Sequence, residues 1–386
     1  DLRFLFLNEL ANNKLKINNN ISINHYNVLN SFIKKRPFKV LEADKNIGIC
    51  ILSNSLEQEL GLSLLNDRKT YEKLNSNPLE NCVNLIKSKL KLLYEKKFVS
   101  KTIYEKLLPR NSKLGSFRFL PKIHKKKFGL RPIINCTNTP STKISVFIDL
   151  LLQFLIKKTP SFLQDSQELL QILNKPTYNN LGKVHLYSCD FESLYTNIDL
   201  YLYLDLILEE ISNNINLDPK IINLVALKEL ILLVYENNFF TYNNSYYKQV
   251  RGLSMGSNCG PSLANLVVYK LEKHWLSLYN PLIYKRYIDD IFIASETEIN
   301  LNIFTNQFLN LKLNIESNSK IQFLDLTIKY DYIFERFKVS LYLKPTNTYS
   351  YLLPNSNHKS SIFRNIPVSL FKRAKRICTE YTDYLY

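Results

Sequence analysis

The four residues Tyr287-Ile288-Asp289-Asp290 constrain this sequence more than any other stretch, because two adjacent carboxylates stand between apolar runs. The flanking segments 282–288 and 291–294 are rich in β-branched and aromatic residues, which predicts two strands meeting at a tight hairpin with the Asp pair at or near its tip. In half-buried strands the two carboxylates would repel each other, and a divalent cation bound through oxygen atoms would relieve that repulsion. Turns favour Asp for local reasons alone, so an ordinary surface turn remains an equal alternative at this point.

The size and charge of the chain narrow the classes of protein to consider. With 386 residues, 45% of them hydrophobic, the chain can bury a large core, and we expect two or three domains. Lys and Arg number 51 against 34 Asp and Glu, which gives a net charge of +17. This excess favours a polyanionic partner such as nucleic acid, and a basic protein without such a partner is the alternative.

The cysteines and the apolar runs argue against several other classes. The six cysteines include no CxxC pair and no His at zinc-ligand spacing, so we expect neither disulfides nor zinc, and a reducing compartment. The most apolar run, 146–156, contains Asp149 and Gln153 and is too short to span a bilayer, so we expect a helix and no membrane anchor. The sequence begins at Asp1 without a signal-peptide pattern, and we expect a segment of a longer product.

Periodicity outside the Asp pair predicts mostly helices in the first half of the chain. Residues 1–40 show helical apolar spacing, and 56–108 and 142–173 are predicted to be mainly helical. Residues 38–52 predict two short strands around the polar corner Asp44-Lys45-Asn46, which is an ordinary turn on this evidence alone.

A basic hairpin is predicted over residues 117–134. Lys122 and Arg131 would lie near its two strands, where an ammonium and a guanidinium could bind a triphosphate or backbone phosphates. For 125–127 a solvated loop is the favoured interpretation. Pro121 and Pro132 favour edge positions in a sheet.

A third carboxylate belongs to a strand predicted over 184–190, which ends at Asp190 and precedes a turn and a helix over 200–214. If this strand lies beside the Asp289-Asp290 hairpin, three carboxylates meet at one place. That arrangement can bind two metal ions about 3.5–4 Å apart. Taken alone, Asp190 is more often a helix cap than a metal ligand.

Segment 249–262 holds three of the chain's eight glycines. Glycine lets the backbone approach a ligand or another segment closely. Pro261 suits the first turn of a helix that runs toward Trp275. The segment is neither a P-loop nor a GxGxxG motif, and a flexible loop is the alternative.

The order of these parts is that of the fingers and palm motifs of reverse transcriptases, and the sequence of each part resembles Penelope-like retroelements, relatives of telomerase. The stretches that carry the resemblance are 43–46, 120–125, 130–133, 193–198, 255–257, 264–265, 286–290, 323–326, 342–346, 356–358 and 373–378. The resemblance spans roughly residues 40–380.

The resemblance implies an α+β fold, a right-hand polymerase with fingers, a palm built on an antiparallel sheet, and a partial helical thumb. It divides the chain into an N-terminal helical extension, a fingers-type region, a palm with the catalytic carboxylates, and a primer-grip hairpin with a partial thumb. The corresponding ranges are 1–40, 41–183, 184–335 and 336–386.

The resemblance also assigns expected roles to individual residues. The catalytic carboxylates would be Asp190, Asp289 and Asp290, which with the Phe191 carbonyl would bind two Mg²⁺ ions, for which Mn²⁺ could substitute. The nucleotide would contact Lys122, Arg131, Tyr195, Met255 and Gly256, with Tyr195 blocking a ribose 2′-hydroxyl. Primer and template would contact Tyr287, Lys344, Arg373 and Arg376, and segment 342–348 would form a primer-gripping hairpin.

The implied function is RNA-directed DNA synthesis, in which a primer 3′-hydroxyl attacks the α-phosphate of a deoxynucleoside triphosphate and pyrophosphate leaves. The expected partners are an RNA template, a DNA primer and dNTPs, in the nucleus or an organelle. One alternative is a non-catalytic RNA-binding or maturase-like descendant, and another is a polymerase that uses a DNA template or none.

Overall fold

The computed structural model describes residues 22–35, 38–123, 128–345, 347, 351–352 and 356–384. The start of the predicted N-terminal extension, the basic loop 124–127 and part of segment 342–348 lie outside the described residues.

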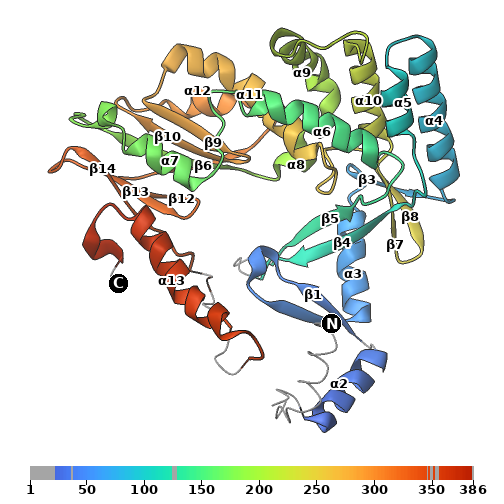
Figure 1. The fold of residues 1–386 in the computed structure, drawn as a ribbon, viewed down its shortest axis with the longest axis horizontal. Coiled ribbons are helices and arrows are strands. Elements are labelled where there is room, and N and C mark those ends of the chain that lie inside the picture. The colour runs from blue at the N-terminus through green and yellow to red at the C-terminus, as the bar shows by residue number, and fades with distance from the viewer. Residues whose placement is uncertain are drawn as a thin grey trace, which may run out of the picture.

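A four-stranded antiparallel sheet in the order β11-β6-β10-β9 lies at the upper left of Figure 1. Its strands are β6 (His185–Phe191), β9 (Ile283–Tyr287), β10 (Asp290–Ser295) and β11 (Leu313–Ser317). Successive side chains of a strand point to opposite faces, so Ile291 and Ile293 enter one core, whereas Phe292 and Ala294 enter another. The sheet is buried on both faces, and the predicted antiparallel palm sheet and α+β class are confirmed.

The larger core begins at one face of this sheet and is built mainly from helices. They are α4 (Leu79–Glu95), α5 (Lys101–Leu107), α6 (Thr142–Ile156), α8 (Leu194–Asn197), α9 (Leu200–Asn214), α10 (Leu224–Glu236), α11 (Gly260–Tyr279) and α12 (Leu301–Asn306). The helix predicted after Asp190 has the predicted bounds, and Pro261 lies in the first turn of α11 as expected.

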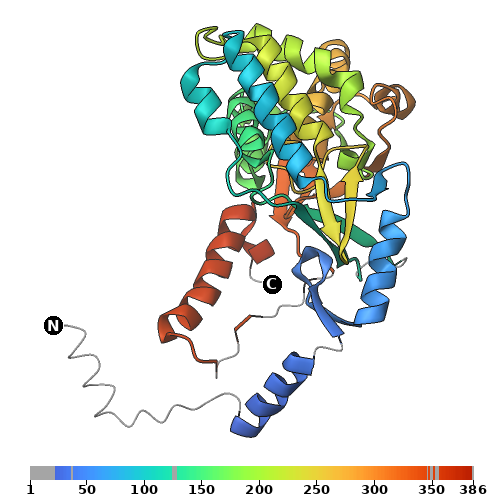
Figure 2. The same cartoon turned by 90° about the vertical axis from the view of Figure 1, so that its right-hand side faces the viewer.

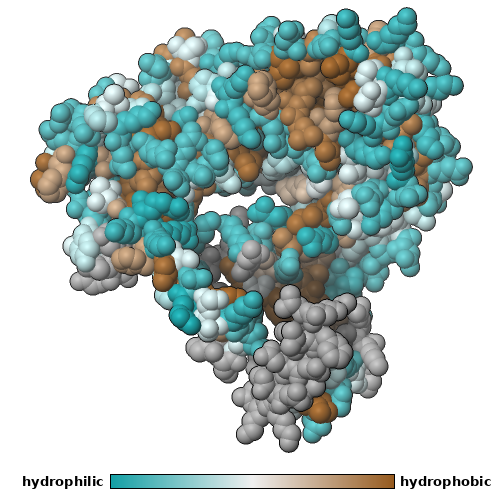
Figure 3. Space-filling model, in the orientation of Figure 1, coloured by the Kyte–Doolittle hydropathy of each residue, from teal (hydrophilic) through white to brown (hydrophobic). Residues whose placement is uncertain are grey.

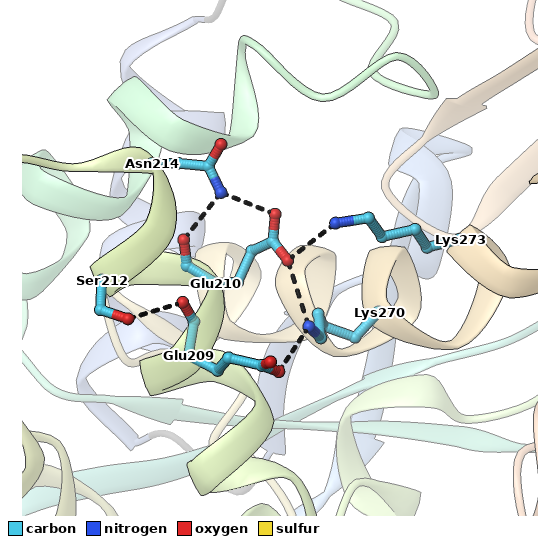
Figure 4. A network of polar contacts seen from close by, with 6 residues as sticks. All are labelled: Glu209, Glu210, Ser212, Asn214, Lys270 and Lys273. Atoms are coloured by element: carbon cyan, nitrogen blue, oxygen red, sulfur yellow. Dashed lines mark hydrogen bonds and ion pairs between the residues drawn. The ribbon is translucent and has the colours of Figure 1, made fainter.

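An ion-pair network joins α9 to α11 (Figure 4). The Lys270 ammonium lies 3.0 Å from Glu209 and 3.2 Å from Glu210, and the Lys273 ammonium lies 3.3 Å from Glu210. The Glu210 side chain is only 3% exposed, so the two lysines compensate a carboxylate that would be costly to bury alone. The network fixes the helices that support the palm sheet.

The second core lies between the other face of the palm sheet and a three-stranded antiparallel sheet. That sheet consists of β12 (Lys320–Phe323), β13 (Leu326–Asp331) and β14 (Arg336–Leu341), and α7 (Ser166–Leu173) packs on the same core. Helix α13 (Ser360–Ile377) extends away from this sheet, and its last residue, Ile377, belongs to the second core (Figure 2).

A five-stranded sheet, β3-β8-β7-β4-β5, contains the predicted basic hairpin. Its strands are β3 (Tyr71–Leu74), β4 (Gly115–Pro121), β5 (Leu130–Asn135), β7 (Phe239–Tyr242) and β8 (Ser245–Gln249). Pro132 lies on the edge strand β5, and Pro121 lies on the part of β4 that only β5 pairs, so both need no second ladder partner. The β7–β8 hairpin comes from the range predicted as palm, so the chain returns to this sheet after leaving it.

The N-terminal segments form a separate arm below the sheets (Figures 1 and 2). Helix α2 (Ile23–Lys35) precedes a hairpin of β1 (Phe38–Glu42) and β2 (Ile49–Ser53), whose connection contains the short helix η1 (Asp44–Asn46). Helix α3 (Asn54–Leu65) follows and leads to β3; the remaining short helices are η2 (Pro176–Tyr178) and η3 (Tyr381–Tyr384).

The range 56–108 is mainly helical and the Asp pair lies at or next to its hairpin tip, as predicted, but the local details differ at three places. Residues 71–74 form strand β3 rather than helix, because β8, far away in sequence, pairs with them. The tip of the Asp pair's hairpin is Ile288-Asp289, so Asp290 already belongs to β10. The described residues Tyr342–Pro345 follow β14 and belong to no strand, and the hairpin that precedes them is β13–β14. In the described part of the chain, no helix combines the length and apolarity needed to cross a bilayer.

Candidate active site

The three predicted carboxylates meet at one end of the palm sheet. The β6–β10 register places Asp290 directly opposite Asp190, and Asp289 precedes Asp290 in the hairpin loop. Directly opposed residues of an antiparallel pair lie on the same face, so two carboxylates crowd each other there. Burial, together with the charges of Asp289 and Asp190, raises the pKa of Asp290 to about 7. Burial and the repulsion between neighbouring carboxylates therefore both disfavour the charged form of Asp290.

A buried arginine shapes the loop that carries Asp289. Ile288 adopts a left-handed backbone with φ of 57°, which is rare for a β-branched residue. Its carbonyl oxygen accepts a hydrogen bond of 3.0 Å from Nη1 of Arg286. The Arg286 guanidinium in turn donates to the buried Glu272 carboxylate at 2.9 Å and to Asn265 Oδ1 at 2.6 Å. This network connects the carboxylate loop to α11, and the sequence offered no signal for it.

A cavity of about 650 Å³ lies beside the carboxylates, between the palm and the basic hairpin. Its lining includes most of the residues predicted to bind a nucleotide or metal: Lys122, Arg131, Asp190, Phe191, Tyr195, Met255 and Asp289. Asp290 and Gly256 do not line it. The fold thus brings together, in one hollow, groups from strands β5, β6 and the β9–β10 loop.

Tyr195 lies between the cationic and anionic sides of this cavity. Burial raises the pKa of its phenol to about 12; the charge of Asp289 acts in the same direction and that of Arg131 in the opposite one. Tyr195 is therefore a neutral, half-buried ring close to both groups.

The position of Arg131 depends on a residue that the sequence reading treated as a turn. Asp44, 4% exposed at the tip of the β1–β2 hairpin, lies 2.9 Å from Nε of Arg131 and accepts a hydrogen bond of 3.3 Å from its Nη2. Both carboxylate oxygens hold the guanidinium, which restricts its orientation. The burial of Asp44 could not be foreseen, because its partner lies on another sheet.

Two glycines of the 249–262 loop permit close packing around the cavity. A Cβ atom at Gly256 would lie 1.6 Å from the carbonyl oxygen of Ile134, near the end of β5. Gly252 has φ of 78°, and a Cβ there would lie 2.6 Å from the Cα of Thr196. The loop therefore contacts the backbone of β5 on one side and of Thr196 on the other. Packing alone requires a glycine at position 256, whether or not a nucleotide binds there.

A second cavity, of about 530 Å³, contains most of the predicted primer and template residues. Tyr287, Lys344 and Arg373 line it, together with Asp325. The Arg373 guanidinium pairs with Asp325 at 2.6 Å, an interaction that also lowers the pKa of Asp325. Arg376 is exposed on α13 and does not line this cavity.

The donor set suits a hard divalent cation that brings part of its own coordination shell. Carboxylate oxygens are the ligands that Mg²⁺ and Mn²⁺ prefer, and the crowding around Asp290 is the repulsion such a cation relieves. Among the described residues, no three His, Cys, Asp or Glu side chains form a ready-made metal cage. Mg²⁺ usually keeps several waters and binds through one or two carboxylates plus substrate phosphates, so no such cage is required.

A palm sheet with carboxylates at one end, facing a second sheet across a nucleotide-sized hollow, defines the right-hand polymerase fold. A family profile described as reverse transcriptase (RNA-dependent DNA polymerase) matches residues 123–331, more than half of the chain. The chain belongs to the reverse transcriptase family. A second profile, the animal helix-turn-helix domain, matches residues 350–385, which include α13.

Solved telomerase structures share this fold. Telomerase from Candida albicans in complex with a TWJ fragment of telomeric RNA matches with a TM-score of 0.59 and 11% identity, over 90% of this chain and 60% of that chain. Apo telomerase from Candida Tropicalis matches with a TM-score of 0.55 and 13% identity, over 89% of this chain and 61% of that one. The chain thus spans about three fifths of these telomerase chains. The comparison with curated proteins gave no match.

Proposed function

We propose that this chain is an RNA-directed DNA polymerase of a Penelope-like retroelement. The observation that carries the proposal is the β6–β10 register, which sets Asp190 and Asp290 opposite each other beside a cavity that also contains Lys122 and Arg131. Anionic and cationic groups at adjoining positions are what transfer of a nucleotide from its triphosphate to a hydroxyl requires. The Penelope-like assignment rests on the sequence stretches 120–125, 193–198 and 286–290.

Each group of residues that lines the cavity has a separate proposed role in binding the nucleotide. Lys122 and Arg131 bind the triphosphate, and Asp44 holds the Arg131 fork in position. Tyr195 packs against the sugar and excludes a 2′-hydroxyl, so deoxynucleotides are preferred. The wall at Met255 faces the incoming base.

Asp190, Asp289 and Asp290, with the Phe191 carbonyl, would hold two divalent cations, Mg²⁺ or Mn²⁺. When bound, such ions lower the pKa of an attacking hydroxyl and neutralise charge on the leaving pyrophosphate. The Arg286 network keeps Asp289 at the end of its loop, so the carboxylates need little reorganisation.

Extension of one DNA primer on RNA and on DNA templates of the same sequence tests the proposal. We expect templated extension on RNA, with dNTPs preferred over NTPs. Extension on DNA alone, or untemplated addition, would favour the other polymerase activities. Salt-sensitive binding of the hybrid with no extension on any template would favour a non-catalytic RNA-binding descendant.

A further inference from the structure

One cationic side chain that lines the second cavity comes from neither the palm sheet nor α13. Lys45 lines it and comes from the tip of the β1–β2 hairpin, whereas Lys344 follows β14 and Arg373 belongs to α13. Figures 1 and 2 show this hairpin and α13 on two sides of the region below the sheets. The space-filling view in Figure 3 shows an opening in that region.

An ion pair with the five-stranded sheet fixes the tip of the β1–β2 hairpin. Asp44, the neighbour of Lys45, is buried and bound to Arg131 of the five-stranded sheet. Lys45 itself adopts a left-handed backbone with φ of 65°, a conformation that Gly or Asn adopts more readily. The Lys45 side chain is exposed, so its ammonium is free to reach a ligand in the cavity that it lines.

The charges around the cavity leave two cations for a ligand. Asp325 is already paired with Arg373, and Asp165 caps α7 by accepting a hydrogen bond from the Glu168 amide. Within the residues that the structure describes, neither the Lys45 nor the Lys344 ammonium forms an ion pair. Both lie near enough to Asp290 to counteract part of the increase in its pKa. The cavity wall also includes Tyr287, whose hairpin carries the carboxylates.

We propose that Lys45, together with Lys344, binds the phosphodiester backbone of the strand whose 3′ end enters the active site. The N-terminal hairpin would then be part of the primer-binding site and would close it opposite the thumb helix. The proposal rests on the proposed function for the identity of the strand. Its chemistry is that of an ammonium as a point-charge ligand of a phosphate, which contributes affinity without sequence preference.

Binding of a DNA-primer/RNA-template hybrid to the full chain, measured by fluorescence anisotropy over a series of salt concentrations, tests the contact. Removing one phosphate contact makes the negative slope of log K against log salt shallower by about 0.9. Across a fourfold rise in salt, the wild type should therefore lose about 3.5-fold more affinity than Lys45→Gln. Lys45→Arg keeps the charge and should restore the wild-type slope, which separates loss of the contact from misfolding.

Lys91→Gln is the matched control, because it removes one exposed lysine charge from α4, away from the opening (Figure 1). Its slope should equal that of the wild type. A slope for Lys45→Gln equal to that of Lys91→Gln and of the wild type would overturn the proposal.

A neutral methylphosphonate linkage near the primer 3′ end identifies the strand. The linkage should weaken binding by the wild type and cause no further loss in Lys45→Gln, because both changes remove the same contact. If the losses of affinity caused by the linkage and by Lys45→Gln add up, the assignment to the primer is overturned. The same holds if the two losses overlap only when the linkage is placed in the template strand.

These binding measurements require no synthesis, so the two proposals can fail separately. If the wild type extends no primer but Lys45→Gln still makes the salt dependence of binding shallower, the contact stands and the polymerase proposal fails. If the wild type extends primers and the slopes coincide, the contact fails and the polymerase proposal stands.

Discussion

Asp290 lies directly opposite Asp190 across the β6–β10 ladder, so two carboxylates share one face at the end of a buried sheet. Like charges in this position destabilise a sheet, typically by some tenths of a kcal/mol up to about 1 kcal/mol. A fold that retains them tolerates a local cost, and the proposed function supplies the reason.

Replacing Asp290 by Asn should therefore stabilise the fold while synthesis falls. In EDTA we expect the free energy of unfolding of Asp290→Asn to exceed that of the wild type by about 0.2–1 kcal/mol. In Mg²⁺ the difference should shrink or reverse, because the wild type, with all three carboxylates, gains more from cation binding. Urea unfolding in both buffers measures this, and a variant less stable than the wild type in EDTA would contradict the repulsion.

Tyr195→Ala should relax the choice of sugar, since the half-buried ring between Asp289 and Arg131 would no longer exclude a 2′-hydroxyl. We expect the ratio of kcat/KM for dNTP over NTP to fall by about tenfold or more. Competing single-nucleotide insertions measure the ratio. Tyr195→Phe keeps the ring and should retain the discrimination; an unchanged ratio in the Ala variant would exclude this role.

Arg286→Met should destabilise the protein strongly, because it leaves Glu272 buried without its cation. Breaking such a pair costs about 3–5 kcal/mol. Adding Glu272→Gln removes the unpaired charge and should recover part of the stability. Synthesis should stay low in the double variant, since the Ile288 carbonyl has lost its donor. Recovery of full synthesis together with stability would show that Arg286 has no positioning role.

Gly256→Ala should cost about 1–3 kcal/mol, because its Cβ would collide with the backbone oxygen of Ile134. Gly182→Ala is the control, since a Cβ at Gly182 meets nothing within 4 Å. Thermal unfolding compares the two. Equal stability of both variants would mean that the loop can move away from β5.

The sequence predicted the elements whose local pattern matches their final environment. The two strands and loop of the Asp pair, the basic hairpin and the helix over 200–214 all follow from periodicity and breakers within a short window. Strand β3 was missed because only its distant partner β8 makes it a strand. Sequence order and family resemblance, rather than periodicity, placed Lys122, Tyr195 and Asp190 at a common site.

The supporting contacts could not be predicted, because they join residues that are far apart in the chain. Asp44 meets Arg131 across two sheets, and Arg286 meets Glu272 from a strand to a helix. From the local sequence, each of these residues would be interpreted as a turn residue or an exposed charge. Only the packing of the folded chain shows that Asp44, Arg286 and Glu272 are buried.

The most direct test of the central claim is extension of a DNA primer on an RNA template with dNTPs and Mg²⁺, comparing the wild type with Asp289→Asn/Asp290→Asn. We predict templated extension by the wild type and a loss of about 100-fold or more in the variant, with hybrid binding retained. Extension by the variant at a rate near that of the wild type would contradict the assignment of these carboxylates to catalysis.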